Sequence, residues 1–403
     1  MTVLRHFFYR LYHAGLRLFV RVYPFPKPLL MHGHGAFEQW REYLTHHQYR
    51  QVLVITDATL YKLGVINPVC DLLDELNIAY HVYSDVEPNP SIETIESGVT
   101  VYRQHHCEAL IAIGGGSVID CAKLIGARAV KPQQSLLKMK GLFKILKALP
   151  PLHALPTTAG TGSETTVAAV FTDPSTHQKY AVSDLCLMPK IAVLLPELTT
   201  QLPASLTATT AMDALTHAIE AYIGINGLAF SDERALSACE MIFAHLPLCM
   251  ANLKEREHRE QLLLASFYAG EAFTRTSVGY VHAFAHNLGA KYGLAHGFAN
   301  AVILPHILRW YGASIHLKLA DIAYRSGLSE STMPIEQAAE SVILRIESLN
   351  RSMDIPAGFP QIASSDIPML AKLILAEAHP DYPVPQFMKI SECEALLKQL
   401  MNG

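Results

Sequence analysis

The chain has 403 residues, half of them hydrophobic and 17% charged, with a formal net charge of −4. This length allows two domains and a large core, and the charge gives no general reason to expect nucleic-acid binding. The seven cysteines are scattered and form no C-x-x-C pair, which indicates reduced thiols in a cytosolic protein rather than a disulfide framework.

The first predicted element is a basic amphipathic helix at residues 1–27. This segment contains Arg5, Arg10, Arg17, Arg21 and Lys27, has no acidic residue, and places leucine, phenylalanine and valine over much of the remaining helix surface. It lacks the long apolar stretch and the small-residue cleavage site of a signal peptide. Such a helix either packs on the protein or a second subunit, which we favour, or lies on an anionic membrane surface.

From residue 28 the chain alternates between strand-like and helix-like segments. We expect helices at 60–76 and 91–105. Short apolar strands are expected at residues 28–31, 51–56, 79–83, 109–113, 152–155 and 191–195. Strands separated by helices of this length predict βαβ units and a mostly parallel sheet.

After about residue 200 the pattern changes to long segments with a period of 3.6 residues. These segments lie at 205–223, 231–251, 259–273, 279–292 and 335–349. The period predicts an all-helical second half. We therefore expect three parts: an N-terminal extension at 1–27, an α/β domain at 28–199 and a helical domain at 200–403.

Two loops in the α/β half are suited to binding phosphate groups. Gly114-Gly115-Gly116-Ser117 follows an apolar strand and opens a helix, where glycines allow close approach and free N–H groups attract anions. Residues 156–164, with the sequence PTTAGTGSE, follow another strand and offer hydroxyl and N–H groups. Two such loops in one sheet predict a dinucleotide site.

Asp57 ends a third strand. A carboxylate in this place can accept hydrogen bonds from an adenosine ribose and repel a 2′-phosphate, which favours NAD over NADP. The alternative is a structural role as the N-cap of the following helix.

Five polar residues in the helical half are candidates for a metal site. Asp213 and His217 are four residues apart, as are His282 and His286, so each pair can share one helix face. We expect His296, which precedes a glycine, to reach the same place from a loop. One carboxylate and three imidazoles suit Fe(II), Zn(II) or a similar ion.

Four motifs together resemble the iron-dependent, or group III, alcohol dehydrogenases, a family of the lactaldehyde reductase type. They are GGGSVIDCAK at 114–123, PTTAGTGSE at 156–164, DALTHAIEAY at 213–222 and HAFAHNLGAKYGLAHGFANAVILPH at 282–306. The resemblance extends from about Leu29 to the C-terminus and leaves the first 27 residues outside. It implies a dinucleotide-binding α/β domain, a helical domain of dehydroquinate synthase-like architecture, and an active site in the cleft between them.

The resemblance also assigns roles to single residues. It implies that Asp213, His217, His282 and His296 are the metal ligands, and that His286 is a catalytic residue near the nicotinamide rather than a ligand. The positions that match cofactor contacts are Asp57, Asn89, Gly115, Gly116, Ser117, Asp120, Thr157, Thr158, Thr161, Ser163, Lys179 and Leu198. The chain departs from the family near its C-terminus, at His379 and at residues 384–386, which leaves the substrate open.

The function that follows is a metal-dependent alcohol dehydrogenase or aldehyde reductase. Hydride would pass between a primary alcohol, or its aldehyde, and NAD(H), while Fe(II), or alternatively Zn(II), polarises the substrate oxygen. His286 would carry the proton. We expect a cytoplasmic homodimer or higher homo-oligomer.

Two alternatives stay open at this point. One is a lyase similar to dehydroquinate synthase, although the ligand region has few basic residues to hold an acidic substrate. The other is a membrane-surface dehydrogenase or scaffold that acts on longer-chain aldehydes. Residues 1–27 and a second acid-free, lysine-rich stretch between Asp120 and Glu164 motivate this second alternative.

Overall fold

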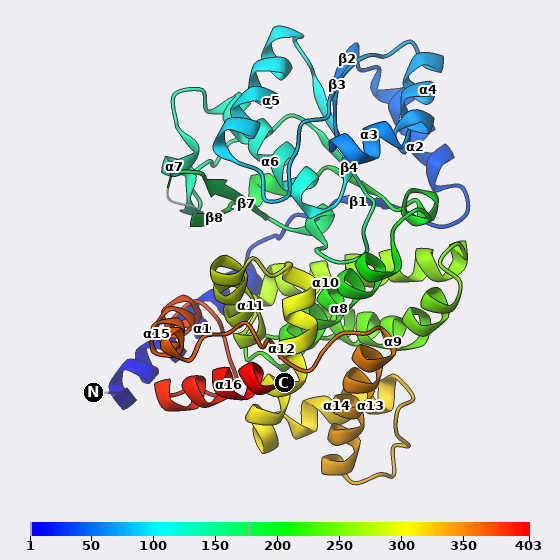
Figure 1. Ribbon diagram of the computed structural model, residues 1–403. Coiled ribbons are helices and arrows are strands. Elements are labelled where there is room, and N and C mark those ends of the chain that lie inside the picture. Colours follow the sequence, from blue (N-terminus) through cyan, green and yellow to red (C-terminus); the bar gives the residue numbers. More distant parts are fainter. Residues whose placement is uncertain (1, 176–177) are drawn as a thin grey trace. The chain divides into compact units, whose positions relative to one another are not determined.

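The computed structural model describes residues 2–175 and 178–403, which form two compact units (Figure 1). The α/β unit contains residues 25–202 and 253–267, and the helical unit contains residues 1–24, 203–252 and 268–403. The fold class is therefore the predicted one. The structure groups residues 1–24 with the helical unit and residues 253–267 with the α/β unit, and neither grouping follows from the sequence pattern.

A six-stranded parallel sheet forms the centre of the α/β unit. Its strands are β1 (Leu29–Met31), β2 (Gln51–Ile55), β3 (Ala79–Tyr83), β4 (Ala109–Gly114), β6 (Leu152–Pro156) and β9 (Ile191–Val193). They lie in the order β1-β9-β6-β4-β2-β3, and every neighbouring pair is parallel. The chain adds β3 on one side of β2 and then β4 on the other, so a topological switch point lies between β2 and β4.

Helices cover both faces of this sheet. They are α2 (Ala36–His47), α3 (Ala58–Lys62), α4 (Asn67–Glu75), α5 (Ile92–Gln104) and α6 (Gly116–Val130). Val52 and Val54 pack with residues of α2 and α4, whereas Leu53 and Ile55 pack with residues of α5 and α6. Burial on both faces explains why the strands are continuous apolar runs. The single helix predicted at 60–76 is two helices, since Gly64 between them has a left-handed φ of 68°.

A smaller sheet and several short helices complete this unit. They are α7 (Leu136–Met139), β5 (Gly141–Leu142), β7 (Ala168–Asp173), β8 (Gln178–Ser183), η1 (Ser163–Thr165), η2 (Leu185–Leu187) and η3 (Pro196–Thr199). Strands β7 and β8 pair antiparallel. The sequence analysis did not predict this hairpin, although Ala169 and Phe171 alternate with less buried residues as a half-buried strand requires.

The helical unit is built around the buried helix α8. Its helices are α1 (Thr2–Val22), α8 (Ala204–Ile223), α9 (Ala229–Ala251), α10 (Arg256–Thr276, from residue 268), α11 (Tyr280–Tyr292), α12 (His296–Tyr311), η4 (Gly312–Ser314), α13 (His316–Arg325), α14 (Ile335–Ser352), η5 (Ser364–Asp366), α15 (Ile367–Ala378) and α16 (Ile390–Asn402). Helix α8 packs against α9 and α12, and α12 also packs against α11 and α14. None of the described helices combines the length and apolar character that crossing a bilayer requires.

Every residue of α8 from 211 to 223 is buried. Asp213, His217 and Glu220 are therefore polar side chains in the interior of the unit. Burying such groups is unfavourable unless they find partners. Their partners define the candidate site.

Candidate functional site

Four of the predicted residues come together in the helical unit. The ligand atoms of Asp213, His217, His282 and His296 all lie within 4.8 Å of one another. Asp213 and His217 lie one turn apart on α8, and His282 lies on α11. The prediction of a loop at His296 was wrong: this residue begins helix α12, with Ala295 as its N-cap.

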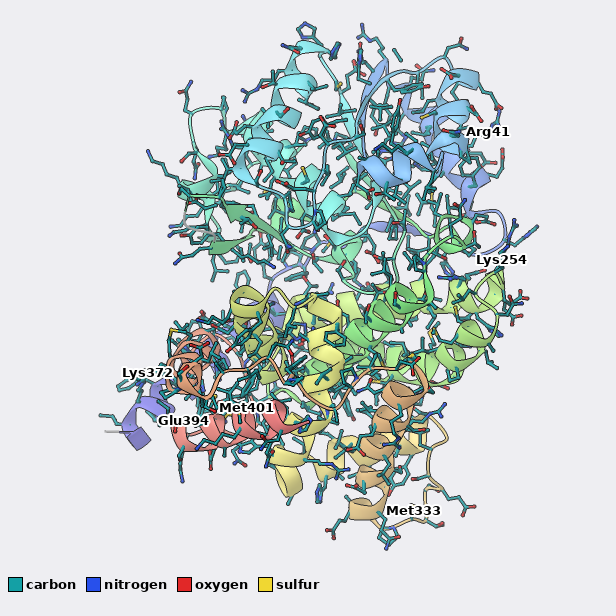
Figure 2. All side chains as sticks on the ribbon, viewed as in Figure 1. Arg41, Lys254, Met333, Lys372, Glu394 and Met401 are labelled. Atoms are coloured by element: carbon teal, nitrogen blue, oxygen red, sulfur yellow. The ribbon has the colours of Figure 1, made fainter. Side chains whose placement is uncertain are left out.

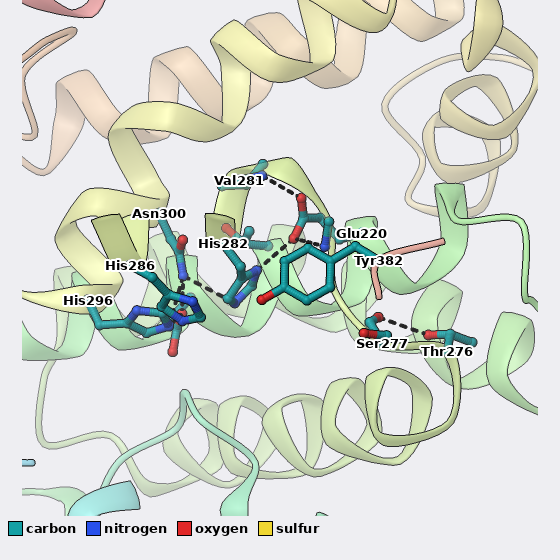
Figure 3. Close-up of polar contacts among 12 residues, drawn as sticks. Glu220, Thr276, Ser277, Val281, His282, His286, His296, Asn300 and Tyr382 are labelled. Atoms are coloured by element: carbon teal, nitrogen blue, oxygen red, sulfur yellow. Dashed lines mark hydrogen bonds and ion pairs between the residues drawn. The ribbon is translucent and has the colours of Figure 1, made fainter. Parts of the chain in front are cut away.

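The contacts of Asn300 show that these donor atoms converge. Its amide nitrogen donates to Asp213 Oδ1 at 2.6 Å and lies 3.3 Å from His282 Nε2 and 3.2 Å from His296 Nε2 (Figure 3). Three acceptor atoms from three helices thus face the positively polarised NH₂ group of Asn300. A divalent cation would suit the same acceptor atoms, and Fe(II) or Zn(II) accepts a set of one carboxylate and three imidazoles. The residues present therefore fit a metal ion.

Glu220 holds His282 in the tautomer whose Nε2 lone pair faces the cluster. It accepts hydrogen bonds from Gly279 N at 2.8 Å, Val281 N at 2.7 Å and His282 Nδ1 at 2.6 Å. The amide donor Asn300 Nδ2 lies 3.3 Å from His282 Nε2, so the lone pair of His282 is on Nε2, which faces the cluster, and Nδ1 carries the proton donated to Glu220. Burial also lowers the pKa of His282 well below its ordinary value, so the ring stays neutral.

The charge state of Glu220 follows from the same contacts. Burial raises the pKa of this carboxyl to about 8, while the backbone N–H groups of Gly279, Val281 and His282 favour its ionised form. All three described partners of Glu220 are donors, so a carboxyl proton would have no acceptor among them. We therefore treat Glu220 as a carboxylate.

His286 lies beside the cluster but outside it. Its ring stacks on His296 with the ring centres 5.1 Å apart, and 43% of its side chain is exposed. Its Nδ1 donates to Glu377 Oε1 on α15 at 2.7 Å. Glu377 also accepts from Tyr382 Oη at 2.9 Å and from Asn287 Nδ2 at 2.7 Å. These contacts orient the carboxylate and, through it, the imidazole.

Gly297 allows α12 to approach α8 closely. A Cβ atom on this residue would lie 2.4 Å from the carbonyl oxygen of Thr209 and 3.3 Å from Cβ of Asp213. The first of these distances is too short for any side chain, and the atom it meets is backbone. The position of His296 next to Asp213 therefore depends on this glycine.

We expect Gly297→Ala to weaken metal binding by about tenfold or more, because α12 must move away from α8 and carry His296 with it. This loss of metal affinity is comparable to the loss caused by removing a residue that orients a metal ligand. Metal content after dialysis against a graded series of chelator concentrations measures it. Gly15→Ala is the control, since a Cβ at Gly15 meets nothing within 4 Å. Equal metal retention in both variants would contradict this role of Gly297.

The two predicted phosphate loops lie at the carboxyl ends of neighbouring strands. Residues 114–117 follow β4 and residues 156–164 follow β6. Cβ atoms built on Gly115 and Gly116 would lie 3.3 Å from Thr158 Oγ1 and 2.6 Å from the side chain of Thr161. The glycine loop thus packs directly against the threonine loop, and this packing requires small residues. The glycine loop lies next to the switch point between β2 and β4, where open α/β sheets bind ligands, and the threonine loop lies one strand further along the sheet.

A buried lysine joins these loops to the small sheet. Lys123 Nζ donates to Ser163 Oγ at 3.0 Å, Thr166 Oγ1 at 2.9 Å and the carbonyl oxygen of Ala168 at 2.8 Å. Burial lowers its pKa to about 8, against the opposing effects of Asp120 and Glu164. This structural role of Lys123 was not predicted from the sequence, although a lysine within the apolar run CAKLIGA is unusual enough to indicate a buried, hydrogen-bonded side chain.

Several of the remaining cofactor candidates form hydrogen bonds within the protein. Asp120 accepts from Ser163 Oγ at 2.6 Å and from Val170 N at 2.9 Å, so it braces the threonine loop. Ser117 Oγ accepts from Asn89 N at 3.1 Å. Asp57 is the N-cap of α3 and accepts through Oδ1 from residues 59 and 60. This is the structural alternative considered for Asp57, and it leaves the proposed contact with a ribose untested.

Three further candidates lie at separate places in the α/β unit. Thr157 is buried and its N–H donates to the carbonyl oxygen of Gly114 at 3.1 Å. Lys179 lies on β8, where burial lowers its pKa. Leu198 lies on η3 and lines a cavity of about 470 Å³ together with Gly33, Gly35 and residues of α10.

Glu220, Asn300 and Glu377 were not predicted from the sequence. Two of them carried a signal: Glu220 follows His217 by three residues and Asn300 follows His296 by four, so each lies on the same helix face as a ligand. Glu377 is 91 residues from His286, and no spacing rule connects them.

Comparison with known proteins gives two family-model matches. A model described as iron-containing alcohol dehydrogenase matches residues 28–196, and one described as the C-terminal part of the Fe-containing alcohol dehydrogenase family matches residues 207–401. Residues 1–27 lie outside both.

Individual relatives agree with these matches. The NAD-dependent methanol dehydrogenase of Bacillus methanolicus is 35% identical over 350 residues, which cover 86% of this chain and 92% of the relative. The lactaldehyde reductase of Escherichia coli strain K12 is 34% identical over 346 residues, or 85% of this chain and 90% of the relative. A crystal structure of 1,3-propanediol oxidoreductase superposes with a TM-score of 0.89 at 33% identity and covers 94% of this chain and 100% of its own.

Proposed function

This chain belongs to the iron-containing alcohol dehydrogenase family, and from that premise we propose that it transfers hydride between a small primary alcohol or aldehyde and NAD(H). The observation that carries the proposal is the convergence of Asp213, His217, His282 and His296 on one point. The resemblance drawn from four sequence motifs is thereby confirmed at the level of the family.

We propose that these four residues hold Fe(II), with Zn(II) as the alternative. The family supports iron, and the donor set accepts either ion. Elemental analysis of protein purified without oxygen distinguishes the two. We assign His286 to proton transfer rather than to the metal, because it lies outside the group of converging ligand atoms and 43% of its side chain is exposed.

For the cofactor, we propose that the two loops and the carboxyl end of β2 form the NAD site. Gly115, Gly116 and Ser117 would approach the pyrophosphate at the start of α6, and Thr157, Thr158 and Thr161 would offer hydroxyl and N–H groups. The packing of glycine against threonine supports this proposal. Asp57, Asn89, Asp120, Ser163, Lys179 and Leu198 complete the proposed set.

The residues of this chain divide the chemistry between them. When bound, the metal ion supplies Lewis-acid polarisation of the substrate oxygen and NAD supplies the hydride acceptor. Glu220 keeps His282 neutral and correctly oriented. His286 donates through Nδ1 to Glu377, which leaves its Nε2 able to accept or release the proton of the alcohol.

Replacing Glu377 should slow proton transfer without removing the metal. In Glu377→Gln the amide can keep one hydrogen bond to His286 or Asn287 but loses the charge that stabilises a protonated imidazole. We expect kcat to fall about 10- to 100-fold, in the range of one general acid–base contribution, with metal content unchanged. A pH profile of kcat separates this effect from general damage. Unchanged kcat at every pH would remove Glu377 from the proton path.

The reaction itself is tested with a panel of alcohols and aldehydes of increasing chain length, followed by NADH absorbance. Net formation of NADH from simple alcohols supports the dehydrogenase and excludes a lyase that uses NAD only transiently. The known relatives, which are alcohol and aldehyde oxidoreductases, do not favour the lyase. Failure across the panel, with metal and NAD bound, would overturn the proposed reaction.

We also propose a cytoplasmic protein that works as a homodimer or higher homo-oligomer and makes peripheral membrane contact through residues 1–27. Light scattering of the purified protein measures the oligomeric state. The membrane contact draws its support from the contacts and exposure of helix α1.

A further inference from the structure

We infer that helix α1 docks on an anionic lipid surface through an apolar face that it turns away from the protein. The inference gives a lipid chemistry to the membrane contact proposed above and does not depend on the reaction. It rests on the way α1 is seated in the helical unit and on the charges beside its exposed face.

The polar stripe of α1 faces the protein. Arg10 donates to the carbonyl oxygens of Val384 at 2.7 Å and Pro385 at 2.8 Å. His13 is fully buried, with its Nε2 against the carbonyl oxygen of Pro380. His6 stacks on Phe387 with ring centres 4.3 Å apart. These residues recur every three or four positions, so they form one face of the helix.

The opposite face is apolar and open to solvent. Leu11 and Leu18 are 60% and 62% exposed, and Val22 is 74% exposed. The apolar residues on this face are Leu4, Phe7, Phe8, Leu11, Ala14, Leu18, Phe19 and Val22. At 100° per residue these positions, with Gly15, cover a continuous arc without a polar side chain. An ordinary surface helix buries its apolar stripe and exposes its polar face. Helix α1 does the reverse: its polar face packs on the protein and its apolar face is exposed. Figure 2 draws the side chains as sticks, and the helix that carries this face is the blue segment at the N-terminal end of the chain.

Positive charge borders this apolar face on both sides. Arg21 follows one edge, Arg17 lies farther round on the side of Arg10, and Arg5 lies beyond the other edge; all three are exposed. The helix contains no acidic residue. The acids that approach it, Asp232 and Asp381, come from the unit on which it packs. An apolar face bordered by arginine is the arrangement by which interfacial helices bind anionic bilayers.

The charge pattern argues against pairing of α1 with α1 of a second copy. In a two-fold arrangement the same surface meets itself, so Arg5, Arg17 and Arg21 would find no acidic residue on the partner helix. Like charges opposed across an interface are unfavourable. An anionic lipid surface supplies the opposite charge and an apolar phase together.

A second exposed segment of the same kind lies in the α/β unit. Residues 131–147 expose Leu137, Leu142, Phe143 and Leu146 beside Lys138, Lys140, Lys144 and Lys147, again without an acid. Lys123 and Arg128, which also lie between Asp120 and Glu164, are buried and do not contribute. We assign this segment a weaker lipid contact of its own, because it has no helix of useful length to present its apolar residues together.

The experiment is co-sedimentation of the full chain with vesicles, without substrate or NAD. Phosphatidylcholine vesicles are compared with vesicles that contain one-quarter phosphatidylserine. We expect binding to the anionic vesicles, weakened by salt because the charges are exposed. Leu11→Ser/Leu18→Ser should lower the partition coefficient by about tenfold or more, and Arg17→Gln/Arg21→Gln by about tenfold. Leu142→Ser/Leu146→Ser should lower it by a smaller factor.

Matched controls separate docking from general surface effects. Leu248→Ser/Leu344→Ser changes two leucines that are 50% and 49% exposed elsewhere in the same unit, and should bind as the unmodified chain does. Circular dichroism confirms that each variant is folded. Equal binding to both vesicle types, or full binding by Leu11→Ser/Leu18→Ser, would overturn the inference. A loss of oligomer mass in that variant, without vesicle binding by the unmodified chain, would assign the face to a second copy and also overturn it.

Discussion

Asp213→Asn should abolish metal retention and reduce turnover by about 10³-fold or more. Polarisation of the substrate oxygen by a metal ion contributes several kcal/mol, and each 1.36 kcal/mol is a factor of ten in rate. The variant is expected to stay folded, because the new side chain has the same shape and its carbonyl oxygen can still accept from Asn300, as Oδ1 does now at 2.6 Å. Metal analysis and NADH-linked turnover measure the two losses.

The control for this variant is Asp321→Asn. Asp321 also accepts a hydrogen bond in the helical unit, from Tyr222 Oη at 2.8 Å, but lies outside the ligand cluster. It should keep both metal and turnover. If Asp213→Asn retains full metal and full turnover, the proposed ligand set is wrong.

Glu220→Gln should affect metal binding and stability together. The three N–H groups around Glu220 need acceptors on both of its oxygens, and a glutamine offers only one. In one outcome a buried N–H group faces the amide NH₂ and has no acceptor, which lowers the free energy of unfolding by about 1–3 kcal/mol. In the other, His282 changes tautomer and turns an N–H toward the cluster. We expect metal affinity to fall about 10- to 100-fold.

Chelator titration and denaturant unfolding of the metal-free protein measure these effects separately. Glu347→Gln is the control, since Glu347 pairs with Arg309 at the surface at 2.9 Å and should contribute less than about 1 kcal/mol. Unfolding and metal affinity that both match the control would show that Glu220 does not set the tautomer of His282.

The sheet was predictable from sequence because its strands are buried on both faces. Runs such as QVLVI and ALIAI contain little but apolar residues, and only a central parallel strand or a buried helix produces them. The hairpin β7–β8 and helix α2 were not predicted. Helix α2 buries Trp40 and Leu44 but carries charged residues around them, so its apolar stripe is narrow.

The ligands of the candidate site were predictable for a different reason. Pairs four residues apart need only local helix geometry, which a sequence reveals. Helix α12 was not predicted, because Gly297 and Pro305 interrupt its helical sequence pattern. In the structure Gly297 lets the helix approach α8, and Pro305 lies inside the helix. Glu377 could not be found, since only the tertiary fold brings α15 to His286.

Helix α1 is held on the helical unit by contacts that do not depend on the side chains of the residues it binds. Arg10 and His13 bind the carbonyl oxygens of Pro380, Val384 and Pro385, and a backbone carbonyl is present whatever side chain the residue carries. Substitutions at these three positions that keep the backbone path should therefore leave α1 in place. A helix attached in this way therefore needs no particular side chain at these positions of the unit that carries it.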